Sequence, residues 1–100
     1  MKSIMQQDDG TCYLCMKLNC DYGPKLYTEE HHAIFGTAQK TLSEKYGLKV
    51  YLCLQHHREG PQAVHNNYKN ARLIQAEAQE AFEKHFPELN FRDIFGKNYK

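Results

Sequence analysis

Cysteines and histidines occur in groups whose spacing suits metal binding. Cys12 and Cys15 are separated by two residues, and Cys53 and His56 have the same spacing. A pair of thiolates in a knuckle and a thiolate with an imidazole on a first helical turn can each form half of a tetrahedral zinc site. We therefore predict a structural Zn²⁺ bound by these four side chains. His57 is an alternative to His56, because residues three and four apart on a helix lie on nearly the same face.

A second set of histidines remains beside this predicted zinc. His31 and His32 are adjacent, and His57 follows His56. If His31 and His57 bind a divalent cation, they leave positions for water and substrate, as catalytic metal sites do. His32 projects differently and stays free of metal, and an imidazole that titrates near neutral pH can take a proton from water. The chemistry favoured is hydrolysis, for example of a phosphodiester. An isolated His-His pair is more often two solvated side chains on the surface than a catalytic pair.

The cysteines and histidines can act together only if strands and helices bring them close in space. Leu48–Leu52 is prone to form a strand, and it leads directly into Cys53. Gly47 is a suitable end for a short preceding helix, and Gly60-Pro61 for a short helix after Cys53. The expected elements are a knuckle turn with short extended flanks at 11–20, a strand at 26–35, a helix within 36–46, a strand at 48–52 and a helix at 54–59.

The clearest helix is expected at 70–86. Apolar residues recur there at three- and four-residue steps, and Pro87 ends the pattern. This amphipathic face is most simply part of the core, and His85 is placed to interact with the helix C-terminus rather than with a metal. One more helical turn is expected at 90–95. The apolar positions are Ile74, Ala78, Ala81, Phe82 and Phe86.

Composition favours one small domain over residues 1–100, with a flexible start at 1–10. The chain has a net charge of +1, four cysteines and no Trp, and its mean hydropathy is −0.77. A thin core of this kind often needs a disulfide or a metal. The first residues lack the apolar segment of a signal peptide, and no run is long enough to span a membrane. We therefore expect a cytoplasmic protein that binds zinc rather than forming disulfides. Cys20 is expected to be a small buried residue.

The motifs resemble those of the HNH endonucleases, also called ββα-metal nucleases. The small phage and prophage members carry a zinc knuckle, a His pair on a first strand and a Leu-Cys-x-x-(Cys/His)-His at the second strand-to-helix junction. The matching segments here are Cys12-Tyr-Leu-Cys15, Glu30-His31-His32 and Leu52-Cys53-Leu-Gln-His56-His57. Further similarity, which includes Phe35-Gly36 and Ala63-Val64-His65, is to a phage group that contains RecA-dependent recombination-enhancement nucleases.

The resemblance implies an α+β fold, a small treble-clef or ββα-metal domain with a core at 12–67. It implies that His32 is the general base and that His31 and His57 hold the catalytic Mg²⁺, Mn²⁺ or Zn²⁺, with His65 as a third ligand. Imidazole ligands suit Zn²⁺ or Mn²⁺ better than Mg²⁺. The central Asn of the family has no clear match, and Ser43 or Tyr46 occupies that region.

DNA is the partner that the resemblance implies, and a recombinase or another phage protein is left open as a second, in a bacterial host. The near-neutral charge means that phosphate contacts must be local. The candidates for such contacts are Lys40, Lys45, Lys49 and Arg58. Two alternatives to a nuclease remain. One is a non-catalytic zinc-stabilised module that binds DNA or protein, and the other is a thiol redox protein that uses Cys12 and Cys15.

Overall fold

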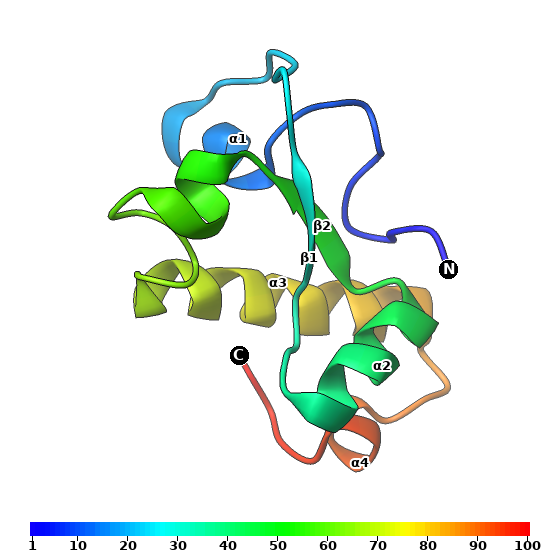
Figure 1. Cartoon of the computed structure of the whole chain (residues 1–100). Helices are drawn as coiled ribbons and strands as arrows, with labels where there is room; N and C mark the ends of the chain where they lie inside the picture. The colour runs from blue at the N-terminus through cyan, green and yellow to red at the C-terminus, as the bar shows by residue number, and fades with distance from the viewer.

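Two short antiparallel strands lie across a long helix, and shorter helices are placed around them (Figure 1). The computed structural model describes all 100 residues. It is an α+β fold with one two-stranded sheet. In chain order the elements are α1 (Tyr13–Asn19), β1 (Glu29–His32), α2 (Thr37–Tyr46), β2 (Lys49–Leu52), the π-helical turn η1 (Gln55–Glu59), α3 (Tyr68–His85) and α4 (Phe91–Phe95).

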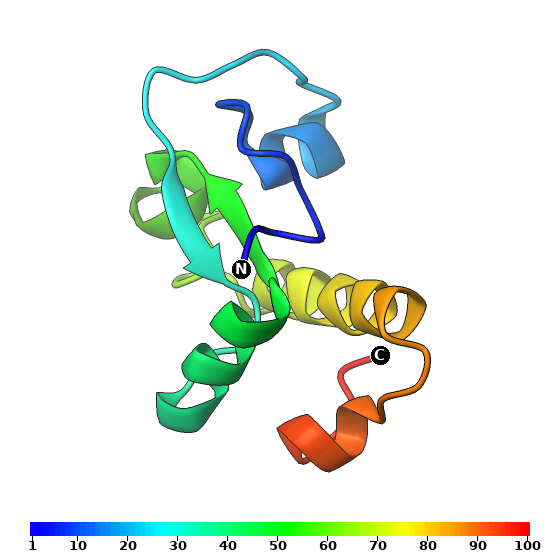
Figure 2. The same ribbon diagram turned by 90° about the vertical axis from the view of Figure 1, so that its right-hand side faces the viewer.

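The sheet brings the His pair beside the strand that leads to Cys53. His31 pairs with Val50 and His32 with Lys49, and Figure 2 shows the two strands side by side. Successive side chains on a strand point to opposite faces, so His31 is buried while His32 is only partly buried. Both predicted strands are confirmed. The first is shorter than expected at 26–35, because Leu26 and Tyr27 are exposed and lie before the paired residues.

The knuckle region was predicted wrongly as a turn with extended flanks. It contains α1, which begins after Cys12, and the sulfur of Cys12 accepts a hydrogen bond from the backbone N–H of Cys15 at 3.4 Å. This contact caps the helix, as a polar side chain does at other helix starts. Cys20 was also predicted wrongly as buried. It ends α1 in the left-handed conformation, with φ of 53°, and its side chain is exposed.

The first residues of the chain form an arm along the free edge of β2, where we expected a flexible start. Ser3 Oγ donates to the carbonyl of Lys49 at 2.5 Å, and Gln6 Oε1 accepts from the N–H of Tyr51 at 2.8 Å. These side chains satisfy edge groups that a third strand would otherwise pair. Gly47 makes room for the arm, because a Cβ there would meet the carbonyl oxygen of Lys2 at 2.4 Å.

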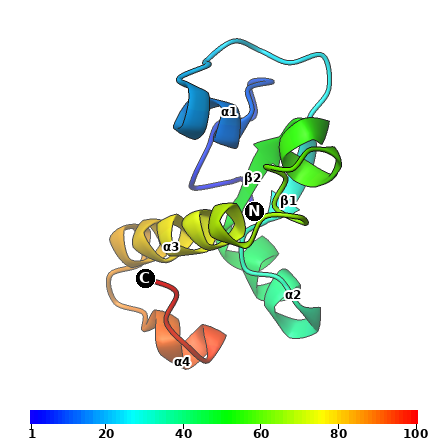
Figure 3. The ribbon, with the colours of Figure 1, turned by 90° about the vertical axis from the view of Figure 1, so that its left-hand side faces the viewer.

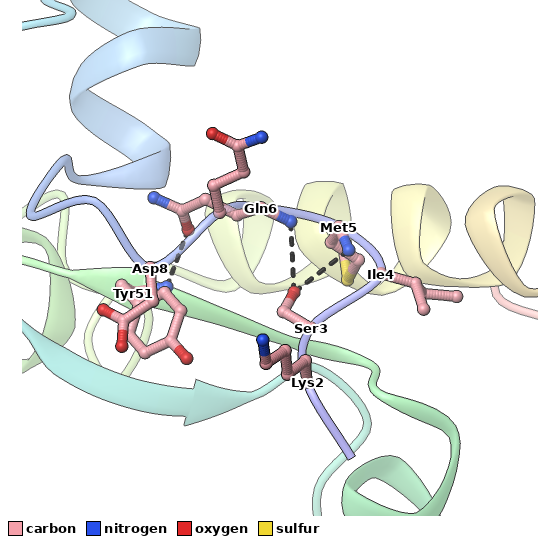
Figure 4. A pocket seen from close by; sticks show the side chains of 8 residues that line it. Lys2, Ser3, Ile4, Met5, Gln6, Asp8 and Tyr51 are labelled. Carbon is pink, nitrogen blue, oxygen red and sulfur yellow. Dashed lines mark hydrogen bonds between the residues drawn. The ribbon is translucent and has the colours of Figure 1, made fainter.

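A surface pocket of about 630 Å³ lies between this arm and Tyr51 (Figure 4). It is the largest pocket of the molecule, and it contains no histidine or cysteine. The chemistry-bearing residues therefore lie elsewhere.

The hydrophobic core lies between α3, the sheet and the last helix. The predicted face of α3 is confirmed, with Ile74, Ala78 and Phe82 fully buried. The helix begins two residues earlier than expected, because Asn67 caps it by accepting from the N–H of Asn70. Phe91 and Phe95 of α4 pack against Phe82, with ring centroids 5.4 and 6.0 Å away. Figure 3 shows α4 beside α3 with the C-terminus between them.

None of the helices combines the length and the apolar character that crossing a membrane requires.

Candidate metal centres

The first cluster contains the four residues predicted to bind structural zinc. Cys12 and Cys15 come from the start of α1, Cys53 follows β2, and His56 lies in η1. His56 Nδ1 lies 3.5, 3.3 and 3.5 Å from the sulfur atoms of Cys12, Cys15 and Cys53, in that order. The sulfur atoms of Cys15 and Cys53 are 3.9 Å apart. Four potential ligand atoms therefore surround one point, and together they could hold a structural metal ion.

The separations match those of a tetrahedral zinc site. Zinc–sulfur bonds of about 2.3 Å and zinc–nitrogen bonds of about 2.0 Å place ligand atoms about 3.8 Å apart for two sulfurs and about 3.5 Å apart for sulfur and nitrogen. A disulfide would instead need two sulfurs at about 2.05 Å. All four cysteines are free. The donor set and its spacing therefore fit Zn²⁺ better than a disulfide.

Burial in this cluster favours the uncharged forms of Cys15 and His56. Burial, followed by the interaction with the sulfur of Cys12, raises the pKa of the Cys15 thiol to about 12. Burial lowers the pKa of His56, so its imidazole is neutral and able to ligate. A bound cation favours the thiolate form of the cysteines that coordinate it. Metal binding at this cluster should release protons.

A single π-helical turn directs His56 and His57 to different places. In η1 the N–H of Gly60 donates to the carbonyl of Gln55, a bond that spans five residues. Such wide turns occur frequently at functional sites. Neighbouring residues on a helix do not share a face. His56 consequently joins the cysteines, whereas His57 joins the second cluster.

The second cluster consists of His31 from β1, His57 from η1 and His65 from the turn after it. Each contributes one ring nitrogen to a group whose atoms all lie within 4.8 Å of one another. The ring centroids of His57 and His65 are 4.8 Å apart, and those of His31 and His57 are 5.3 Å apart. His65 returns toward the other two because the N–H of Val64 donates to the carbonyl of His56. The structure thus brings together all three histidines that the resemblance assigned to a catalytic metal.

One buried nitrogen of this cluster has no hydrogen-bond partner. His31 Nε2 is buried and makes no hydrogen bond. Burial, reinforced by His57 and His65, lowers the pKa of His31 to about 3, so its imidazole is neutral. An unpaired buried polar atom costs free energy, and a cation bound by the three imidazoles would remove that cost. This orphaned atom is the structural observation that fits a metal here.

Glu29 supports the second cluster through His57, and no motif in the sequence pointed to it. Its Oε1 lies 2.6 Å from His57 Nδ1, and its Oε2 accepts from Arg58 at 2.8 Å. The hydrogen bond from His57 is the main cause of a lowered pKa of Glu29. A carboxylate on one imidazole nitrogen leaves the other nitrogen as the ligand, as in many zinc sites. Its position in the sequence could have identified it, since Glu29 precedes His31 by two residues and such residues share a strand face.

His32 lies on the opposite face of β1 and contacts carboxylates rather than the other histidines. Its Nε2 is 2.8 Å from Glu44 Oε1 and 3.6 Å from Glu30 Oε1. Lys49 Nζ binds both carboxylates, at 3.0 Å from Glu44 and 3.4 Å from Glu30. No motif in the sequence pointed to Glu44, which comes from α2 and is twelve residues from His32. Because the lysine already occupies this acidic group, we do not treat it as a third metal site.

The four candidates for phosphate contacts differ in their surroundings. Lys40 lines a pocket of about 310 Å³ together with the second cluster and His32. Lys49 is buried in ion pairs, Arg58 is paired with Glu29, and Lys45 lies over the ring of Tyr46. Lys40 is therefore the one of the four that faces the histidines without an acidic partner.

Ser43 and Tyr46 have separate roles. Ser43 Oγ donates to the carbonyl of Ile34 at 2.7 Å and accepts from its N–H at 3.1 Å, so it ties α2 to the segment after β1. Tyr46 packs in the aromatic core, 5.2 Å from the ring of Phe82. Of the two side chains, only Ser43 makes hydrogen bonds to the backbone of the segment after β1.

Comparisons of the chain with protein-family models, with curated proteins and with solved structures found no match.

Proposed function

We propose that this chain is a metal-dependent endonuclease of the HNH type that hydrolyses DNA phosphodiester bonds. Two adjacent metal centres of different character support the proposal. The cysteine cluster is closed by four protein ligands, which is the pattern of structural zinc. The histidine cluster has three imidazoles at a surface pocket, which leaves room for water and substrate. The observation that carries the proposal is the buried, unpartnered Nε2 of His31 in that second cluster.

The proposed architecture is a treble clef around zinc that continues into a ββα-metal unit. α1 supplies the knuckle ligands and η1 the last ligand, while β1, β2 and η1 carry the second cluster. The π-helical turn joins the two centres, since His56 and His57 belong to one each. We expect the zinc to fix this turn and thereby the position of His57.

His32 acts as the general base in this proposal. Glu44 holds its Nε2 at 2.8 Å, and a carboxylate only accepts hydrogen bonds when ionised. Nε2 therefore carries the proton and Nδ1 presents a lone pair that can take a proton from water. The water oxygen then forms a bond to phosphorus, the bond to the leaving oxygen breaks, and that oxygen gains a proton from solvent.

A divalent cation bound by His31, His57 and His65 would supply positive charge for the developing phosphorane and the leaving oxygen. The chain itself orients that site through Glu29 on His57. It orients the base through Glu44 on His32, and it fixes the loop after β1 through Ser43. Ser43 occupies the place of the central Asn of the family in this scheme.

The test is nicking of supercoiled plasmid across Mg²⁺, Mn²⁺, Ni²⁺ and Zn²⁺. We expect His32→Ala to abolish nicking while the zinc content, the fold and DNA binding stay as in the wild type. General-base removal typically costs about 100- to 10,000-fold in rate. His85→Ala is the matched control, since His85 lies at the end of α3 and outside both clusters.

Two results would contradict the proposal. Unchanged nicking by His32→Ala would remove the assigned base. DNA binding by the wild type with no cleavage under any cation would favour a non-catalytic zinc-stabilised module instead. The thiol redox alternative predicts oxidised Cys12 and Cys15 and no bound zinc, which a zinc stoichiometry on reduced protein measures.

A further inference from the structure

Phe35 is the one apolar side chain that lines the histidine pocket. The other lining residues are the four histidines of β1, η1 and the turn, together with Glu30 and Lys40. Phe35 follows β1 closely, and its ring centroid lies 5.9 Å from that of His31, with the planes tilted by 53°. Its side chain is 50% exposed. One part of the ring therefore packs against a candidate metal ligand, while the remainder faces solvent at the rim.

The surroundings of Phe35 define the chemistry of a ligand that fits there. The floor of the pocket offers imidazoles for a cation, and Lys40 offers a positive charge in the first turns of α2. Phe35 offers a flat apolar surface beside them. A nucleotide has the complementary parts, an anionic phosphate and a flat base with a π face. A simple anion would use the charges and leave the ring exposed.

We propose that Phe35 and Lys40 form a nucleotide subsite in which the ring of Phe35 stacks on a base that lies outside a double helix. The inference rests on the proposed function, because it assumes that the phosphate sits at the second cluster. In a duplex the bases stack on one another and present only their edges in the grooves. Only a single strand, a frayed end or an extruded base therefore offers a base face on which the ring of Phe35 can stack.

This subsite makes single-stranded or locally opened DNA the preferred substrate class. Base stacking on an aromatic ring is tolerant of sequence, because every base has a π face. Lys40 contributes a phosphate contact, which is likewise independent of sequence. The pocket therefore selects for strand structure rather than for a base sequence.

The test measures binding separately from cleavage. The probe is a fluorescein-labelled single strand of about twelve nucleotides, within the usual range of single-strand sites, with the matching duplex as the second probe. A third probe is the same single strand with abasic central positions. Binding is followed by fluorescence anisotropy on zinc-loaded protein with Ca²⁺ added, and gels check that each probe stays intact.

We expect Phe35→Ala to weaken binding of the single strand roughly tenfold, the size of one base–aromatic stack. Phe35→Trp should restore it. The duplex should bind the wild type more weakly than the single strand and be affected less than about twofold by Phe35→Ala, since its stacked bases leave no face free except at the two ends. The abasic probe should bind wild type and Phe35→Ala equally. Tyr22→Ala is the matched control, since Tyr22 is an exposed aromatic residue outside the pocket.

Equal binding of the single strand by wild type and Phe35→Ala would overturn the inference, as would an equal loss on the abasic probe. These outcomes differ from failure of the nuclease proposal. Binding that depends on Phe35 without plasmid nicking would retain the subsite and reject catalysis. Plasmid nicking together with binding that does not depend on Phe35 would retain catalysis and reject the subsite.

Discussion

Replacing His56 and His57 one at a time should have opposite consequences, although they are neighbours on one turn. His56→Ala removes one of four ligands from the closed cluster. In small zinc domains the metal contributes about 10–16 kcal/mol of folding free energy. One ligand of four then accounts for roughly 3 kcal/mol, which lowers the Tm of a domain of this size by roughly 12–24 °C. Because His56 is 7% exposed, its loss also leaves a buried gap beside three thiols.

His57→Ala should leave the zinc and most of the stability intact. His57 points to the second cluster, and its Nδ1 partner Glu29 keeps a second contact with Arg58. We expect a Tm within about 4–8 °C of the wild type, the shift produced by about 1 kcal/mol. Plasmid nicking should nevertheless be lost, because a ligand of the proposed catalytic cation is missing.

The assay combines zinc stoichiometry, thermal unfolding and nicking on the same preparations. Wild type and His57→Ala should keep one tightly bound zinc, and a strong chelator should unfold both. The reasoning fails if His56→Ala keeps both its zinc and its Tm, or if verified removal of all metal leaves the wild-type Tm unchanged. A large loss of stability in His57→Ala with zinc retained would show that the second cluster is structural instead.

Two further predictions concern the residues that position His32. Ser43→Ala leaves the buried N–H and carbonyl of Ile34 without their partner, so we expect a loss of about 2 kcal/mol in urea unfolding, and a wild-type midpoint would contradict this. Glu44 has its pKa lowered to about 2, chiefly by the hydrogen bond with His32 and then by that with Lys49. Its unfolded value is about 4.3, so its stabilisation is present above that pH and is lost as the pH falls toward 2. The side chain is 43% exposed, so solvent screening limits the effect to less than about 1 kcal/mol. The difference in Tm between wild type and Glu44→Gln should therefore shrink between pH 4.5 and pH 2, and a constant difference would refute the assignment.

The ligand sets were accessible from the sequence because metal chemistry constrains local spacing. Cys12 with Cys15 and Cys53 with His56 have the separations that one ion requires, and the structure brings these four side chains together. The helix around Phe82 was also predictable, because its apolar residues recur at three- and four-residue steps, and the strand around Val50 was predictable from its β-prone residues. Local pattern was misleading at α1, where the sulfur of Cys12 acts as the N-cap of a helix.

Only the tertiary structure decided how the two centres are supported. Which of His56 and His57 joins the cysteines depends on the π-helical turn η1. The spacing of the residues does not distinguish such a turn from an α-helical one. Glu29 and Glu44 reach histidines that are distant in the sequence, and the pairing of β1 with β2 determines which face each histidine occupies. Sequence fixes which groups can bind an ion, because that is a property of each side chain. Packing determines which of their atoms remain free to do so, because neighbours from other elements compete for the same nitrogens and oxygens.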